Sequence, residues 1–255
     1  GIPVTFLFRE EQDQLAKTLT EPGKLVYFET PANPNMAILD IRAIAETAHQ
    51  NGALVAVDNT FASPINQKPL ELGADLVLHS ATKYLGGHSD LTAGALMTSA
   101  SLAKPVVAWR KNLGQLIAPE TAALLSRSLR TLPLRVRQHN ENAMAVAQAM
   151  EQHPKITKVH YPGLPSFEGH ELAKRQMTGF GGMLSIEVKG GQQAAEKVAD
   201  SLNVFLLATS LGGVESLVSQ PSATSHHGLS REERLKRGIG DGMLRLSVGL
   251  EDTAD

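Results

Sequence analysis

The first part of the chain alternates short apolar runs with a stretch of helical periodicity, and no other feature constrains the fold as strongly. Apolar runs at Leu25–Glu29, Ala53–Val57, Asp75–His79 and Ala93–Thr98 predict four strands. Between the first two, Leu39–Gln50 carries apolar residues at helical spacing and predicts a helix. Strand, helix and strand in this order predict an α/β fold with a mostly parallel sheet and right-handed crossovers.

The rest of the chain predicts further helices and a second, smaller unit. A helix is expected near Gln67–Leu72, and two more at Glu120–Leu132 and Leu134–Gln152, with Pro133 separating them. An α+β unit follows, with strands at 156–160, 183–188, 205–208 and 244–248 and helices near 171–177 and 192–202.

These elements predict two domains. A large domain is expected over residues 1–133, followed over residues 134–255 by a long connecting helix and a C-terminal α+β domain. The strand-like first residues, Gly1–Phe6, lack an initiator methionine and the basic start and cleavage site of a signal peptide. We expect the chain to begin inside the large domain, as part of a longer protein.

Composition and charge exclude several classes of protein. The 255 residues are 42% hydrophobic, and no apolar run is long enough to cross a membrane. A net charge of -2 argues against a protein that binds a nucleic-acid backbone, so neither nucleic acid nor membrane is expected as a partner. The absence of cysteine excludes disulfides and thiolate chemistry. The densest basic cluster is expected on a solvated or subunit-facing helical surface, and consists of Arg127, Arg130, Arg135 and Arg137.

The window after the third strand carries small hydroxyl residues, one lysine and two glycines. Ligands of open α/β sheets bind beyond the carboxyl ends of the strands, which places Ser80, Thr82 and Lys83 where a phosphorylated small molecule could sit. The lysine can form a Schiff base there if its neighbours keep the amine partly deprotonated. Taken alone, however, Lys83 is more simply an ordinary surface lysine.

Two other strand ends change that balance. Asp58 closes the second strand, where a buried carboxylate needs a cationic or hydrogen-bonding partner. In pyridoxal-phosphate (PLP) enzymes that partner is the pyridinium nitrogen, and the alternatives are a helix cap or a loop ion pair. Asn33 follows the first strand between Pro31 and Pro34, which restrict its backbone, although a simple turn would also explain this pattern. Together, Asn33, Asp58 and Lys83 predict a pocket at adjacent strand ends.

The histidines do not predict a metal site. His79, His88 and the pair His226–His227 have no carboxylate or second histidine at ligand spacing, so we expect them in polar loops and expect no metal. Gly212–Gly213 lacks the third glycine of a dinucleotide fingerprint, which disfavours a nucleotide-dependent oxidoreductase.

Five segments, taken in order, resemble the trans-sulfuration enzymes of Cys/Met metabolism: Glu29–Pro34, Val57–Phe61, Ser80–Tyr84, Ser210–Ser216 and Arg245–Glu251. That family includes cystathionine γ-synthases, cystathionine γ- and β-lyases, methionine γ-lyases and homoserine-ester sulfhydrylases. The resemblance extends over essentially the whole chain. It implies a PLP-dependent, aspartate-aminotransferase-like (type I) fold from which the N-terminal segment of the family is absent.

The resemblance also implies a role for each residue that matches a family motif. Lys83 would be the Schiff-base lysine and the proton carrier between substrate carbons. The other cofactor contacts would be made by Asp58 at the pyridine nitrogen, Ser80 and Thr82 at the phosphate, Asn33 near the phenolic oxygen and Thr60 close to the ring.

Three residues would contact the substrate. Arg245 would bind the α-carboxylate as a bidentate pair, with Ser210 beside it. Glu215 would shape the substrate pocket, and a plain charged loop residue is an equal alternative.

We therefore predict a PLP-dependent enzyme that performs γ-elimination or γ-replacement on a homoserine ester or cystathionine, as a cystathionine γ-synthase or γ-lyase does. Methionine γ-lyase, sulfhydrylase and β-lyase activities are alternatives within the family. A non-catalytic α/β fragment or assembly module is the alternative of a different class. The resemblance further implies an amino-acid substrate, a homotetramer and a cytoplasmic location.

Overall fold

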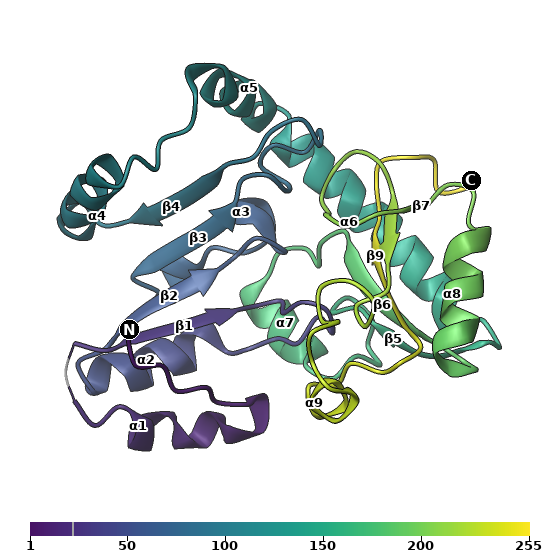
Figure 1. Ribbon diagram of the computed structural model, residues 1–255, viewed down its shortest axis with the longest axis horizontal. Coiled ribbons are helices and arrows are strands. Elements are labelled where there is room, and N and C mark those ends of the chain that lie inside the picture. Colours follow the sequence, from purple (N-terminus) through teal and green to yellow (C-terminus); the bar gives the residue numbers. More distant parts are fainter. Residues whose placement is uncertain (22) are drawn as a thin grey trace.

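The computed structural model describes residues 1–21 and 23–255, and it contains two mixed sheets with helices around them (Figure 1). The longest helix, α6 (Leu132–Glu151), contacts strands of the second sheet and also α3 (Ser63–Asn66), which follows the first sheet's second strand. Within the described residues no helix is both long and apolar enough to span a bilayer.

The first sheet has the strand order β1 (Leu25–Glu29), β2 (Leu54–Asp58), β3 (Leu76–Ser80) and β4 (Gly94–Thr98). The first three strands are parallel and β4 is antiparallel to β3, so the expected mostly parallel sheet is confirmed. The parallel strands all end at one edge of the sheet.

One face of this sheet is packed against α2 (Ile41–Gln50). Val55, Val57 and Val77 form a buried cluster with the apolar stripe of α2, because alternate strand residues point to the same face. Asp40 caps α2 by accepting a hydrogen bond from the Ala43 backbone N–H at 3.0 Å. This packing holds β2 and β3 against α2.

The second sheet has the order β5 (Ile156–His160), β6 (Met183–Val188), β9 (Met243–Ser247), β8 (Leu217–Ser219) and β7 (Leu206–Leu207). Helices α6 and α8 (Gly191–Ser201) pack against it. All five residues of β9 are buried, as expected of a central strand with helices on the sheet.

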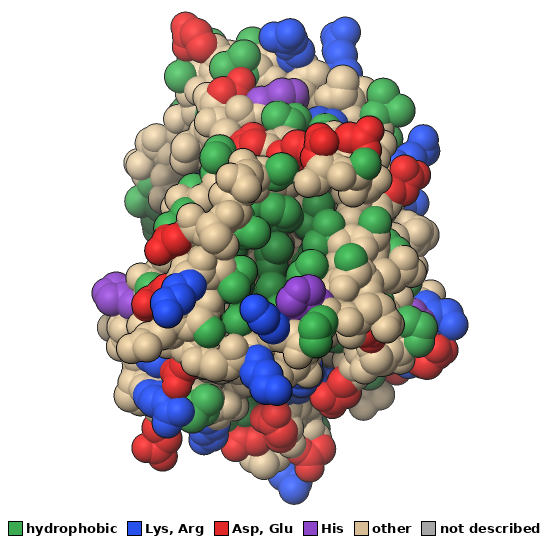
Figure 2. Space-filling model, turned by 90° about the vertical axis from the view of Figure 1, so that its right-hand side faces the viewer, with side chains coloured by type: hydrophobic (Ala, Val, Ile, Leu, Met, Phe, Trp, Pro, Cys, Tyr) green, Lys and Arg blue, Asp and Glu red, His purple; other side chains and the backbone are tan. Residues whose placement is uncertain are grey.

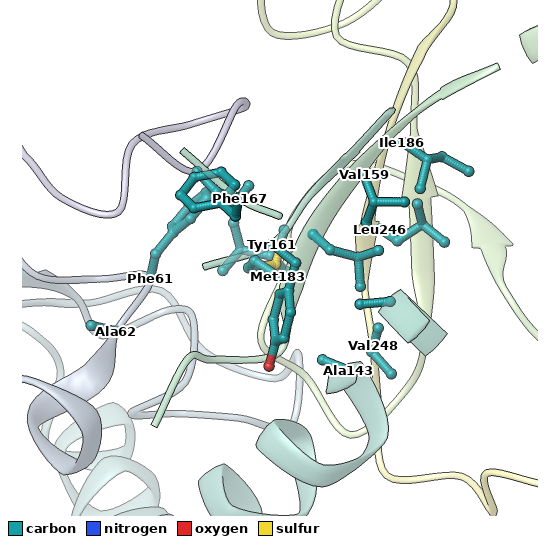
Figure 3. Packing of buried hydrophobic residues seen from close by; sticks show 14 of the residues in the cluster. Phe61, Ala62, Ala143, Val159, Tyr161, Phe167, Met183, Ile186, Leu246 and Val248 are labelled. Carbon is teal, nitrogen blue, oxygen red and sulfur yellow. The ribbon is translucent and has the colours of Figure 1, made fainter. Parts of the chain in front are cut away.

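One apolar cluster joins the two halves. Phe61 and Ala62, which follow β2, belong to the same buried cluster as Tyr161, which follows β5, and Met183 of β6 (Figure 3). The Tyr161 hydroxyl donates a hydrogen bond to the Gly181 carbonyl at 3.0 Å. The strand ends of the first sheet are therefore held against the second sheet by packing.

The remaining elements are short, apart from α4 (Ala100–Asn112) and α5 (Pro119–Leu129), which follow the first sheet in the sequence. The short ones are the 3₁₀ helices η1 (Arg9–Gln14) and η2 (Pro69–Leu72) and the α-helices α1 (Leu15–Thr18), α7 (His170–Gln176) and α9 (Arg231–Lys236). On the face shown in Figure 2, acidic and basic side chains are interspersed, and apolar side chains line a central hollow.

The structure differs from several expectations about elements. The strand-like first residues form no strand, and Ile2 is 90% exposed. The helix expected near 67–72 is only the short 3₁₀ helix η2, which begins at Pro69. Pro133 lies in the first turn of α6, where a missing N–H costs nothing, so it does not separate two helices there. Helices α4 and α9 and strand β8 were not expected.

Replacing Leu184 by Ala is expected to lower the free energy of unfolding by about 3 kcal/mol, through lost burial and the cavity left behind. Leu184 lies in β6, is fully buried and belongs to the shared cluster. Leu134→Ala is the control, since Leu134 is 67% exposed and its loss is expected to cost at most about 0.5 kcal/mol. Urea unfolding measures both, and equal losses would contradict the packing described here.

Candidate active site

A cavity of about 530 Å³ lies where the carboxyl ends of β1, β2 and β3 face β9. Seven of the nine residues predicted from the sequence line it: Asn33, Asp58, Thr60, Ser80, Lys83, Ser210 and Arg245. The rest of the lining comes from Glu29, Phe61, Thr209, Leu211, Thr224 and Ser225. Residues far apart in the sequence thus meet at the sheet edge where ligands of open α/β sheets bind.

Local hydrogen bonds fix the end of β2. The Thr60 N–H donates a hydrogen bond to Asp58 Oδ1 at 2.9 Å. Aspartate side chains commonly make such a turn with the backbone two residues later. Thr60 Oγ1 in turn accepts from the Ser80 N–H at 2.8 Å. Asp58, Thr60 and Ser80 are therefore held together across two neighbouring strands.

Lys83 lies in the turn after β3, with its amine in the cavity. Its Nζ donates to Ser210 Oγ at 2.8 Å. Burial lowers the pKa of Lys83, and the nearby Arg245 guanidinium lowers it further. Both effects favour the neutral amine, which is the nucleophilic form.

The buried Arg135 side chain donates a hydrogen bond to the backbone next to Lys83. Arg135 Nη1 donates to the Tyr84 carbonyl at 2.8 Å, and Nη2 donates to the Ser128 carbonyl at 3.0 Å. Arg135 is only 5% exposed, so its expected place on a solvated surface was wrong; Arg127, Arg130 and Arg137 are exposed. Two carbonyl oxygens and the Thr131 hydroxyl, which accepts from Arg135 Nε at 3.1 Å, satisfy the guanidinium.

Arg245 reaches the cavity from β9 and is 7% exposed. Its Nη1 donates to Asn33 Oδ1 and its Nη2 to the Ser210 carbonyl, both at 3.0 Å. Burial lowers the pKa of Arg245. No carboxylate among residues 1–21 and 23–255 lies within ion-pair distance of it, so its charge remains available to an anionic ligand.

Glu29 is a cavity residue to which the sequence analysis gave no role. It is paired with Asp58 in the parallel register of β1 and β2, and its carboxylate accepts from the Asn33 N–H. Burial raises the pKa of Glu29 to about 7, with Asp58 adding to the rise, while the Asn33 N–H and Arg245 oppose it. Its place at a strand end, like that of Asp58, is the signal that could have identified it.

Two predicted residues, Thr82 and Glu215, line a neighbouring cavity of about 520 Å³ that shares Thr209 and Ser210 with the first. The Thr82 hydroxyl accepts from the Ala93 N–H at 3.1 Å. Glu215 accepts a hydrogen bond from Ser89. The structure thus brings these two residues to the edge of the site, beside the Lys83 cavity.

His79 is not in a polar loop as expected. It lies in β3, is 4% exposed, and its Nε2 has no hydrogen-bond partner within the described residues. Burial lowers its pKa to about 4, so the ring is neutral at pH 7. The alternation of a strand with one buried face explains this burial.

The chain resembles known proteins over its full length. The sequence model of the Cys/Met metabolism PLP-dependent enzymes matches residues 1–255. An L-methionine gamma-lyase of Fusobacterium nucleatum subsp. polymorphum is 43% identical over 258 residues, which cover 100% of this chain and 65% of that protein. A cystathionine gamma-synthase of Mycobacterium tuberculosis is 48% identical over 244 residues, covering 95% of this chain and 62% of that protein.

Solved structures agree with the sequence comparison. The crystal structure of cystathionine gamma synthase from Xanthomonas oryzae pv. oryzae, in complex with aminoacrylate and cysteine, has a TM-score of 0.91 and 48% identity. The match covers 95% of this chain and 63% of that one. The chain thus spans 62% to 65% of the length of these three relatives. The match over all 255 residues, together with this shared fold, shows that the chain belongs to the family of Cys/Met metabolism PLP-dependent enzymes.

Proposed function

We propose that the protein is an enzyme of sulfur amino-acid metabolism that performs γ-elimination or γ-replacement on a homoserine ester or cystathionine. One observation carries this proposal: Lys83, Asp58 and Arg245 line a single cavity. The nucleophilic amine of Lys83 suits a cofactor aldehyde, and the carboxylate of Asp58 suits a ring nitrogen. The guanidinium of Arg245 suits a substrate carboxylate. The names of relatives support γ-synthase and γ-lyase chemistry, with methionine γ-lyase and β-lyase activities as alternatives.

The residues of the cavity fit pyridoxal phosphate. Its volume of about 530 Å³ lies within the usual range of small-molecule sites. Lys83 would hold the cofactor covalently, Asp58 would pair with its ring nitrogen, and Ser80, Asn33 and Thr60 would contact its remaining polar atoms. When bound, the cofactor supplies an electron sink for the carbanion next to the substrate amine.

Lys83 would also move the protons of the reaction. Its Nζ, once free of the cofactor, would remove the proton from the substrate Cα and give that proton up to the cofactor carbon that had held Lys83. Neutral again, it would remove a second proton from Cβ. Burial and the nearby Arg245 lower the pKa of Lys83, which raises the fraction of the neutral amine, the form that a general base requires. The hydrogen bond to Ser210 Oγ orients the amine toward Arg245, where the substrate carboxylate would lie.

Further expectations complete this proposal. Thr82 would support the phosphate from the neighbouring cavity, and Glu215 would shape the part of the site that receives the substrate side chain. The division at residue 133 into a large and a smaller domain, the homotetramer and the cytoplasmic location are part of the same proposal. A non-catalytic assembly module is the rival reading, and it predicts that the cavity holds no cofactor.

Lys83→Ala tests the covalent attachment. With added PLP the unmodified protein is expected to show visible absorbance that borohydride fixes to Lys83, as peptide mass spectrometry would detect. The variant is expected to show no fixed label. Lys68→Ala is the control, because that lysine is 64% exposed and pairs with Glu71 at 3.1 Å. An unmodified protein without visible absorbance would favour the assembly module.

Arg245→Gln is expected to raise KM for the amino-acid substrate about 30-fold or more, since a buried charge partner of the carboxylate is lost. The same change removes the cation that lowers the pKa of Lys83, so that pKa is expected to rise. The rate of cofactor attachment to Lys83 should then reach half its maximum at a higher pH. Arg245→Lys keeps the charge and should leave this midpoint in place.

Stopped-flow absorbance over a pH series measures the midpoint, and steady-state kinetics measure KM. An unchanged midpoint in Arg245→Gln would refute the electrostatic link between Arg245 and Lys83.

A further inference from the structure

A series of hydrogen bonds, linked through Asn33, Arg245 and Ser210, leads from Glu29 to Lys83. The Glu29 carboxylate accepts from the Asn33 N–H, and Asn33 Oδ1 accepts from Arg245 at 3.0 Å. Arg245 then donates to the Ser210 carbonyl at 3.0 Å, and the Ser210 hydroxyl accepts from Lys83 at 2.8 Å. Glu29 is the member at the far end of this series, and no step of the proposed reaction uses it.

The orientation of Arg245 depends on Asn33. Of the two acceptors that the guanidinium uses, Asn33 Oδ1 is the side-chain one, and the other is a backbone carbonyl. Asn33 lies in the loop after β1. The next residue, Pro34, is bound to the second sheet, because its carbonyl accepts a hydrogen bond from Ser185 Oγ at 2.6 Å. Glu29 is the group that binds the backbone of Asn33 itself.

Glu29 reaches this loop as a hydrogen-bond acceptor. No ion pair joins its carboxylate to Arg245 within the described part of the chain, and the groups that face it electrostatically are Asp58, Tyr27 and Arg245. A glutamine at this position would keep the acceptor and lose the charge. An aspartate would keep the charge and lose the reach.

We propose that Glu29 is a positioning residue for Arg245: by accepting the Asn33 N–H, it sets the Asn33 side chain that aims the guanidinium at the substrate carboxylate. This inference rests on the proposed function, because it takes Arg245 to be the carboxylate site. It assigns Glu29 a role in substrate recognition without any contact with the reacting atoms.

The test compares two probes on the PLP-loaded protein. L-Alanine carries an amine and a carboxylate but no leaving group, and ethylamine carries the amine alone. Titration of the cofactor absorbance gives both dissociation constants, and their ratio reports the carboxylate contribution. Glu29→Gln and Glu29→Asp are the matched pair, Glu71→Asp is the exposed control, and thermal unfolding verifies that each variant is folded.

Glu29→Asp is expected to weaken alanine binding relative to ethylamine about tenfold, the cost of one charge-assisted hydrogen bond. Glu29→Gln should stay within about threefold of the unmodified protein, because it keeps the acceptor. In the double variant with Asn33→Ala, Glu29→Asp should cause no further loss, as a residue acting through Asn33 requires.

The opposite pattern overturns the inference: an unchanged ratio in Glu29→Asp, a loss in Glu29→Gln as large as in Glu29→Asp, or additive losses with Asn33→Ala. Failure of the proposed function is a separate result. In that case the unmodified protein shows no visible cofactor band, or its preference for alanine survives Arg245→Gln.

Discussion

The parallel pairing of β1, β2 and β3 is the constraint on which the site depends. Because parallel strands end at one edge of a sheet, the pairing sets Glu29 beside Asp58 and Asp58 beside Leu78, so that Ser80, two residues on, lies next to Thr60. The turn after β3 then carries Lys83 over that edge. A register shift of one residue would turn every one of these strand-end side chains to the face packed on α2.

The second sheet supplies what the first cannot, a cation buried opposite the strand ends. Arg245 has room on β9 because its register neighbours on both sides, Ser185 and Ser219, are small. Its bond to Asn33 crosses from one sheet to the other, and the shared apolar cluster that includes Phe61 and Tyr161 packs the two sheets together beside it. The first sheet thus supplies the two carboxylates and Lys83, and the second sheet supplies Arg245.

Much of this arrangement could be predicted from the sequence. Strand ends are local features, so Asp58 and Lys83 could be assigned to one edge, and family motifs added Arg245 and Ser210. The buried state of Arg135 could not be predicted, because two of its three partners are backbone carbonyls, and that of Tyr84 is brought to it only by the fold. His79 was expected both at the end of the strand Asp75–His79 and among histidines of polar loops; the strand expectation is right, and strand alternation buries the ring. Thr82 shows the remaining limit: its hydroxyl is bonded to the Ala93 backbone, which no motif indicates.

The pairing of Glu29 with Asp58 also bears on how the protein is stabilised. The two carboxylates lie side by side in a poorly solvated cavity, where burial raises the pKa of Glu29 to about 7 and the charge of Asp58 adds to the rise. Any bound molecule that places positive charge or a hydrogen-bond donor against this pair stabilises it, and binding to the folded state alone shifts the folding equilibrium by mass action. The free energy of unfolding is therefore expected to be lower for the empty protein than for the protein with its cavity filled. Thermal unfolding would then report how much of the protein has a filled cavity.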